Sequence, residues 1–309
     1  MRERPAEVDD DALLAGVRRA WDPEIVRVEH LPVGFGAHHW AAYVDDAPRL
    51  FVTFDRFGDR HTAATLEDAY AGAVALREAG LDEALTPVRL ATGSCTVPLA
   101  GGALSCSPWR DGRSGGDLDV PWTRRTLTRL HAMTPPAGIR RWAPLVGPDL
   151  ADTIATLTRR PWGPGPYADR ARTAVAEHLS ELATWTARYH HLGGVARDRD
   201  WVAAHGEPHS FNQLLTDDGT RLLIDWDTLT LAPAELDLRT LVEAGAEPRD
   251  VGADAEMLEL FDLEWRLDEL HQYSEWFAAP HAGTADDEIA FGGLLHELER
   301  PGQAATSAG

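Results

Sequence analysis

Lysine is absent from this chain, so all 29 residues in the combined Lys and Arg count are arginines. Any chemistry that needs a lysine ammonium must therefore be done by another group. The chain also lacks an unbroken apolar run of about 18 residues, which excludes an ordinary membrane-spanning helix. Its first residues, MRERPAEVDDD, are polar and acidic and lack the apolar core of a signal peptide, so we expect a cytoplasmic protein.

Cysteine is scarce as well. Two cysteines, Cys95 and Cys106, are too few for a disulfide scaffold in a chain of 309 residues, and no metal-ligand spacing surrounds them. Both lie in segments that we expect to form adjacent strands, so a bond between them stays open. We expect two buried thiols in a reducing compartment.

Basic charge is outnumbered by acidic charge. The 50 acidic residues exceed the 29 basic ones, which gives a formal net charge of −21. This charge argues against nucleic acid or an anionic membrane as a partner, because both repel an acidic surface. The negative charge is compatible with a cationic ligand, and solubility alone also explains it.

The order of predicted elements indicates an α+β protein. A helix over 9–20 and strands over 25–34, 38–46 and 49–57 precede a helix over 62–80, and short strands follow over 87–109. After a glycine-rich stretch at 110–119, the patterns are mostly helical. We expect helices over 123–133, 170–192 and 255–277, the last with Leu260, Leu263, Leu267 and Leu270 on its apolar face.

These elements predict a small β-rich N-terminal lobe over 1–104 and a helical C-terminal lobe over 121–300. Residues 105–120 are expected to form the hinge or linker, and residues 301–309 a disordered tail. A ligand site is expected in the cleft between such lobes.

The most informative stretch is HGEPHSFNQLLTDDGTRLLIDWD, residues 205–227. Two short apolar segments joined by DDG predict a β-hairpin that brings Asn212 and Asp225 together. An amide oxygen beside a carboxylate suits Mg²⁺ that carries nucleotide phosphates. Glu207 lies on the loop that enters the hairpin, where it can accept a proton from a hydroxyl or orient that hydroxyl.

The pattern HGE…N…IDWD…LAPAELDL resembles the aminoglycoside phosphotransferase family, a branch of the protein-kinase-like fold, and within it the spectinomycin-phosphotransferase-like group. The likeness is strong from about 203 to 241 and weaker from 31 to 117. It implies a two-lobed kinase-like fold, Mg²⁺, and ATP or GTP as the phosphate donor.

By this resemblance, Glu207 stands where the family has its catalytic aspartate, and Asn212 and Asp225 stand where it has its Mg²⁺ ligands. Asp227 would support a second metal or the loop, and His205 would brace the loop by hydrogen bonding. Glutamate keeps the carboxylate and adds one methylene, so this departure is mild.

The N-terminal lobe departs further from the family. Gly34 and Gly36 occupy the place of the phosphate-binding loop, but His39 stands where kinases have a third glycine. Thr53 stands at the position of the phosphate-gripping lysine. Loss of that cation predicts a decrease of about two to four orders of magnitude in rate. The residues near enough in sequence to compensate are Arg56, Arg60, His38 and His39.

Two further groups complete the predicted donor site. Ser107 and Trp109, in the hinge around 105–109, are expected to hold the purine ring through backbone groups. On the helix after the lysine position, Glu67 or Asp68 would lack its usual ion-pair partner, or would be an ordinary solvated residue.

Glu264 and Asp268 lie on one face of the predicted helix over 255–277, in the region where the family builds its acceptor pocket. They face either water or a cationic, polyhydroxylated amine. The acceptor classes left open are aminocyclitols, choline-like amino alcohols, homoserine, sugars and nucleosides. The sequence favours an active small-molecule kinase over a pseudoenzyme that only binds nucleotide or a small molecule, because the metal-facing groups are all present.

Overall fold

The computed structural model describes residues 4–5, 7–34, 36–58 and 61–301. Contacts group the chain into two compact units, one of Met1–Trp142 with Trp201–Ala246 and one of Ala143–Asp200 with Glu247–Gly309. The predicted lobe boundaries divide the chain differently and stay a prediction. Arg60 and almost all of the predicted tail lie outside the described residues.

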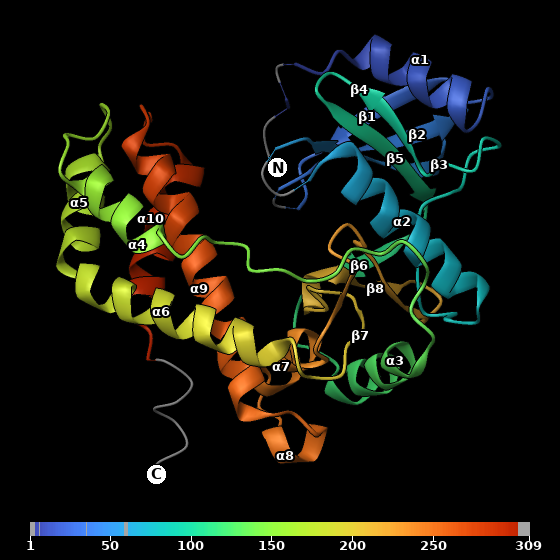
Figure 1. Cartoon of the computed structure of the whole chain (residues 1–309). Coiled ribbons are helices and arrows are strands. Elements are labelled where there is room, and N and C mark those ends of the chain that lie inside the picture. Colours follow the sequence, from blue (N-terminus) through green and yellow to red (C-terminus); the bar gives the residue numbers. More distant parts are fainter. Residues whose placement is uncertain (1–3, 6, 35, 59–60, 302–309) are drawn as a thin grey trace. The chain divides into compact units, whose positions relative to one another are not determined.

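The first unit contains an antiparallel five-stranded sheet with the order β1-β2-β3-β5-β4 (Figure 1). Its strands are β1 Arg27–Leu31, β2 His38–Val44, β3 Ala47–Arg56, β4 Thr96–Leu99 and β5 Gly102–Pro108, and its helices are α1 Asp10–Ala20 and α2 Ala63–Glu78. The predicted helices and strands of this region are confirmed, in the predicted order.

The alternation of side chains along the strands gives the sheet two different faces. One face packs against α1 in a core that contains Leu13, Val17, Trp40, Ala42, Leu50, Val52, Phe54, Leu104 and Cys106. The alternate residues of β3, Phe51, Thr53 and Asp55, therefore point to the opposite face. Both cysteines are free and buried, as predicted.

Helix α2 begins with a capping box in which Thr62 and Thr65 bond each other's backbone N–H groups. It ends before Gly80, whose φ of 108° is the left-handed conformation that glycine tolerates. The chain then pairs with β9, Arg221–Leu223: the Leu85 N–H donates to the Leu223 carbonyl at 2.9 Å, and the Leu223 N–H donates to the Glu83 carbonyl at 2.8 Å.

The rest of the first unit surrounds the predicted hairpin. The elements are α3 Val120–Ala132, α7 Glu235–Glu243, the 3₁₀ turn Ser210–Asn212, the sheet of β6 Gly112–Ser114, β8 Gln213–Thr216 and β9, and the pair β7 Val202–Ala204 and β10 Thr230–Ala232. The hairpin is confirmed. Part of the predicted hinge is strand β6, paired with β8, where a Cβ on Gly112 would lie 2.5 Å from the Leu215 carbonyl oxygen.

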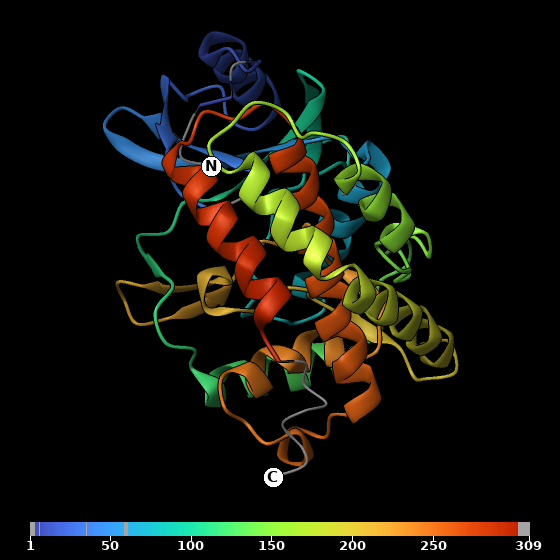
Figure 2. The ribbon, with the colours of Figure 1, turned by 90° about the vertical axis from the view of Figure 1, so that its left-hand side faces the viewer.

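The second unit is helical (Figure 2). It consists of α4 Leu150–Thr158, α5 Ala168–Glu177, α6 Leu179–Ala196, α8 Pro248–Val251, α9 Ala255–Ala278 and α10 Ala285–Glu299. Helix α9 buries the four predicted leucines. The single helix predicted over 170–192 is wrong, because the chain breaks at His178, whose Nδ1 lies 2.8 Å from the Ala174 carbonyl oxygen. The predicted α+β class is confirmed.

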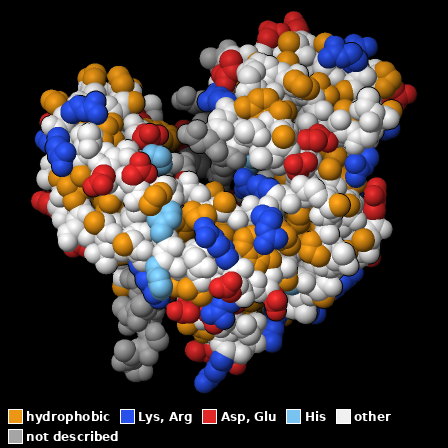
Figure 3. Space-filling view, viewed as in Figure 1, with side chains coloured by type: hydrophobic (Ala, Val, Ile, Leu, Met, Phe, Trp, Pro, Cys, Tyr) orange, Lys and Arg blue, Asp and Glu red, His pale blue; other side chains and the backbone are white. Residues whose placement is uncertain are grey.

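Charged side chains are distributed over the surface. Acidic and basic groups are interspersed with apolar ones on the face seen in Figure 3, and no single charged patch covers it. Within the part of the chain that the structure describes, no helix is both long and apolar enough to cross a membrane.

Candidate functional site

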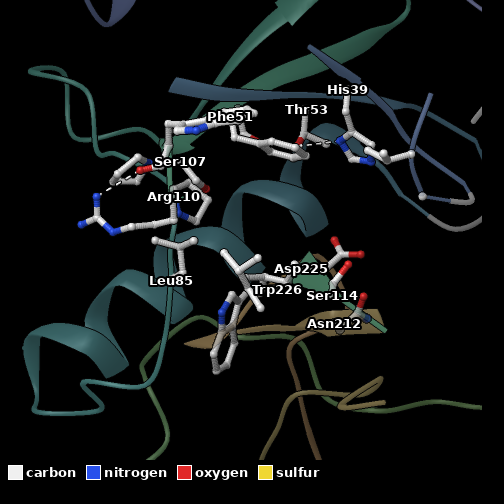
Figure 4. Close-up of a pocket in the computed structure, with 18 of the residues that line it drawn as sticks. His39, Phe51, Thr53, Leu85, Ser107, Arg110, Ser114, Asn212, Asp225 and Trp226 are labelled. Carbon is white, nitrogen blue, oxygen red and sulfur yellow. Dashed lines mark hydrogen bonds between the residues drawn. The ribbon is translucent and has the colours of Figure 1, made fainter. Parts of the chain in front are cut away.

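A cavity of about 390 Å³ lies in the first unit, on the side of the five-stranded sheet that faces away from α1. Its wall includes seven of the predicted donor-site residues: Gly34, His39, Thr53, Ser107, Trp109, Asn212 and Asp225. Five of the other residues predicted to act in catalysis or to bind metal or nucleotide lie outside that wall: Gly36, His38, His205, Glu207 and Asp227. Figure 4 shows Ser107 and Arg110 at one end and Asn212 and Asp225 at the other.

The hairpin brings Asn212 and Asp225 to the same end of the cavity. The Ile224 N–H donates to the Asn212 carbonyl at 2.9 Å, so the residue that precedes Asp225 is paired directly with Asn212. The Asn212 side-chain amide donates to the Glu207 carbonyl at 2.9 Å, which leaves its oxygen as the acceptor on the cavity side. Asp225 has a φ of 67°, a strained conformation for aspartate of the kind found at functional sites.

Carboxyl groups crowd this end of the cavity. The side chain of Asp225 is exposed toward the cavity, but the surrounding protein displaces part of its water and Asp227 and Asp55 lie close by, and together these raise the pKa of Asp225 above its usual range. Burial and Asp227 also raise the pKa of Asp55 to about 7. Crowded carboxyls of this kind favour a cation, because it relieves their mutual repulsion.

The fit to Mg²⁺ rests on a small donor set. Among the described residues, no three His, Cys, Asp or Glu side chains are grouped to hold a metal. Asn212 and Asp225 nevertheless offer an amide oxygen and a carboxylate. This suits Mg²⁺, which is commonly bound by one or two protein carboxylates together with substrate phosphates and water.

His205 braces the loop before the hairpin. Its ring is buried, Nε2 lies 2.9 Å from the Ile224 carbonyl oxygen, and Nδ1 accepts the Glu207 N–H at 3.3 Å. Burial lowers the pKa of His205. The neutral ring with its proton on Nε2 satisfies both hydrogen bonds.

Asp237 of α7 also fixes this loop by hydrogen bonding. Its buried carboxylate accepts the N–H groups of His205 at 3.0 Å and Gly206 at 2.8 Å, and it lies 2.8 Å from His131 Nε2. Although burial raises it, the His131 contact keeps the pKa of Asp237 below its usual range. Gly206 has a φ of 99°, and a Cβ there would lie 2.8 Å from Thr228 Oγ1.

Replacing Asp237 by alanine is expected to lower the free energy of unfolding by about 3 kcal/mol, because three buried donors lose their acceptor. Urea denaturation measures this loss. Asp152→Ala, at an exposed position of α4, is the control and should change little. A loss below about 1 kcal/mol, the size of an ordinary surface effect, would contradict the role of Asp237.

Thr53 faces the cavity at the predicted lysine position. It pairs with His39 across β2 and β3, and its hydroxyl is hydrogen-bonded to His39 Nδ1 at 3.2 Å. Burial, with His38 adding repulsion, lowers the pKa of His39 to about 3, so His39 is neutral at pH 7. In the nucleotide-free protein His39 therefore carries no charge that replaces the missing cation.

The two other predicted substitutes that the structure describes, His38 and Arg56, also point elsewhere. His38 lies on the core face, with its ring 6.4 Å from the rings of Trp40 and Phe54. The Arg56 guanidinium is bonded to Glu7 at the surface. The arginine in the described part of the wall, Arg110, lies at the hinge end and donates to the Trp109 carbonyl at 3.1 Å.

Glu67 serves β4 rather than β3. Its carboxylate accepts the Cys95 N–H at 2.7 Å, the Thr96 N–H at 3.0 Å and the Thr96 hydroxyl at 2.6 Å. It is therefore neither a partner for position 53 nor a solvated residue. Asp68 is exposed, as the alternative interpretation expected.

The hinge end of the cavity is aromatic and apolar. The Phe51 ring lies 4.9 Å from the His39 ring and 6.3 Å from the Trp109 ring. Leu85 and Pro87 complete this end. A planar base fits such a wall, with phosphates extending toward Asn212 and Asp225.

The predicted acceptor residues belong to the second unit. Glu264 is only 5% exposed and accepts a hydrogen bond from the Tyr189 hydroxyl, so the water-facing interpretation is wrong for it. Asp268 accepts the Gln272 side-chain amide at 2.7 Å. Their contact with an acceptor stays a prediction.

Four residues of this region were not singled out from the sequence. Asp55, Tyr70 and His61 lie near Asp225 and Asp227, and His131 contacts Asp237. One signal for Asp55 was available in the sequence. Alternate residues of a strand lie on the same face, so the acid two residues after Thr53 shares the face of Thr53.

Comparisons with known proteins identify the family and the fold of this chain. A sequence model of the phosphotransferase enzyme family matches residues 28–280. Protein StrN of Streptomyces griseus is 33% identical over 145 residues, and that match spans 44% of this chain but only 43% of StrN.

Among solved structures, spectinomycin phosphotransferase APH(9)-Ia in complex with ADP and spectinomycin has a TM-score of 0.73 at 13% identity, with 97% of each chain covered. Amicoumacin kinase hAmiN has a TM-score of 0.60 at 16% identity, with 95% of this chain and 94% of that one covered. These likenesses confirm the predicted kinase-like fold. Because the family model matches most of its length, this chain belongs to the phosphotransferase enzyme family.

Proposed function

We propose that this phosphotransferase moves the γ-phosphate of ATP or GTP to a hydroxyl of a small molecule. The observation that carries the proposal is the meeting of Asn212 and Asp225 at one end of a cavity whose other end is lined by Phe51 and Trp109. That arrangement suits a nucleotide with its base at the aromatic end and its phosphates at the oxygen-rich end.

In this proposal Asn212 and Asp225 hold Mg²⁺, which when bound neutralises charge on the phosphate oxygens. Glu207 orients the acceptor hydroxyl and takes its proton as the oxygen of that hydroxyl bonds to the γ-phosphorus, while the bond from this phosphorus to the bridging oxygen breaks and ADP or GDP leaves. Asp227 lies 2.8 Å from His61 Nε2, which favours loop support over binding of a second metal. His205 acts only through the loop that it braces.

The proposed acceptor is a cationic, polyhydroxylated amine. The net charge of −21 favours such a molecule. Spectinomycin, bound by one structural neighbour, has this character, and Glu264 with Asp268 are the acidic groups that we assign to its recognition. The protein would then modify an antibiotic or take part in making one.

Mass spectrometry of aminocyclitols, nucleosides and amino alcohols incubated with Mg-ATP or Mg-GTP tests the proposal. A phosphate-sized gain in mass on one acceptor class is the expected result. Mg-nucleotide binding without product from any class would favour a pseudoenzyme. That second candidate rests on Thr53 and the neutral His39, which leave the phosphate end short of positive charge.

Thr53→Lys is expected to tighten Mg-ATP binding by about tenfold or more, because a partly buried cation would face the phosphates beside Asp225. Calorimetry measures the dissociation constant. Thr128→Lys, at an exposed position of α3, is the control for added charge and should leave it unchanged. Unchanged affinity in Thr53→Lys would mean that phosphates do not reach this strand.

A further inference from the structure

Helix α2 and the segment that leads into it make two polar contacts across the first unit. The Tyr70 hydroxyl donates to Asp55 Oδ2 at 2.9 Å, and both side chains are 5% exposed or less. His61, directly before the helix, places Nε2 2.8 Å from Asp227 Oδ2. Figure 1 shows α2 between the five-stranded sheet and the strands β6 and β8, where it can reach both.

The two carboxyls that these contacts hold, Asp55 and Asp227, each lie two residues after a residue of the site. Asp55 follows Thr53 by two residues on the same face of β3, and Asp227 follows Asp225 by two residues. Tyr70 itself lines the cavity. Helix α2 and the residue before its N-cap therefore contact both the strand with the lysine position and the segment with the proposed metal ligand.

The ion pair expected between position 53 of β3 and an acid of α2 is not made here. Thr53 is bonded to His39 on β2, and Glu67 is bonded to β4. The Tyr70–Asp55 bond joins the same helix to the same strand with a phenol and a carboxyl in place of an ion pair.

Stability alone does not account for these contacts. A carboxyl in a buried site near a second carboxyl is unfavourable, and apolar residues of similar size are often at least as stable there. Tyr70 forms a hydrogen bond with the Asp55 carboxyl and His61 contacts the Asp227 carboxyl, and each contact fixes the position of its carboxyl.

Within the function proposed above, we infer that Tyr70 and His61 are positioning residues: through Asp55 and Asp227, α2 ties β3 to the segment that carries Asp225 and sets where that carboxylate meets the nucleotide phosphates. The two bonds take the place of a lysine–acid ion pair in a chain that has no lysine.

Kinetics with Mg-ATP and an accepted acceptor test the inference. Tyr70→Phe removes one hydroxyl and should lower kcat by about tenfold, as expected for one hydrogen bond to a charged group, with KM changed far less. His61→Leu should lower kcat similarly, and His61→Gln, which keeps a donor near Nε2, should restore most of it. Tyr43→Phe is the matched control, since Tyr43 lies on β2 under Arg27 and away from the cavity.

Hydrogen exchange of residues 224–228 in the nucleotide-free protein separates this inference from the proposed function. Faster exchange there in Tyr70→Phe than in Tyr43→Phe supports the link even if no acceptor or nucleotide is found, in which case the proposed function alone fails. Equal exchange and equal kcat in the two variants would overturn the inference. So would a lower unfolding temperature with kcat and exchange unchanged.

Discussion

Replacing Asp225 by asparagine is expected to abolish metal-dependent nucleotide binding and turnover while it stabilises the metal-free protein. Asparagine keeps the shape and one oxygen but removes the charge that Mg²⁺ requires. We expect kcat/KM to fall by about a thousandfold or more, the size of effect found when a charge-stabilising group is lost. Calorimetry with Mg-ADP and steady-state kinetics measure the two losses.

The gain in stability follows from the crowded carboxyls. A carboxyl whose folded pKa is raised binds more protons in the folded than in the unfolded state, so its contribution to stability falls as pH rises. For Asp55 the window runs from the ordinary value of 3.8 to about 7, and Asp225 shifts in the same direction. Asp55 is present in both proteins, so Asp225 alone makes the difference: without metal, the unfolding temperature of the wild type should fall relative to that of Asp225→Asn as the pH rises above the ordinary carboxyl value of 3.8.

Asp217→Asn is the control for this pair of measurements, because Asp217 is exposed on the turn of the same hairpin. It should match the wild type in binding and in the pH dependence of unfolding. If Asp225→Asn still binds Mg-ADP with unchanged affinity, the metal lies elsewhere. If its stability falls at pH 8, the carboxyls do not repel one another as the structure indicates.

Glu207→Gln is expected to reduce product formation by about a hundredfold to ten-thousandfold, the range for loss of a catalytic acid or base. Nucleotide binding should persist, because Glu207 lies outside the described wall of the cavity. The loop should also persist, since its contacts use the Glu207 backbone: the N–H donates to His205 and the carbonyl accepts from Asn212.

Glu207→Asp is the informative companion variant. It restores the residue that the family motif has at this position, but it draws the carboxylate back by about 1 Å or more, which can cost about a hundredfold in rate. We expect activity between that of the wild type and that of Glu207→Gln. Undiminished turnover in Glu207→Gln would show that another group receives the hydroxyl proton.

Local patterns predicted much of this molecule. The strand patterns over 38–46 and 49–57 predicted β2 and β3, and the DDG turn predicted the hairpin that brings Asn212 to Asp225. Both inferences depend on residues close in sequence, where periodicity and turn chemistry act directly. Position 53 was identified from the resemblance to the family, and it lies in the cavity wall.

The remainder depends on contacts that no local pattern contains. The contact between His131 and Asp237 spans 106 residues, and the bond from Glu67 to Cys95 spans 28. The neutral state of His39 follows from burial, which the sequence predicts only for core faces. The helix break at His178 was missed because the apolar spacing continues across it, and spacing alone does not reveal a side chain that bonds the preceding turn.

The two faces of the five-stranded sheet have a consequence for how such a site can change. Val52 and Phe54 pack under α1, while Phe51, Thr53 and Asp55 alternate with them on the cavity side. A substitution at position 53 therefore leaves the core intact, so a lysine there can be gained or lost with little effect on folding. An insertion of one residue in β3 would instead exchange the two sets and drive a carboxyl into the core. Substitutions on the cavity face of β3 can therefore change the chemistry of the site, whereas folding requires that the length and register of the strand stay the same.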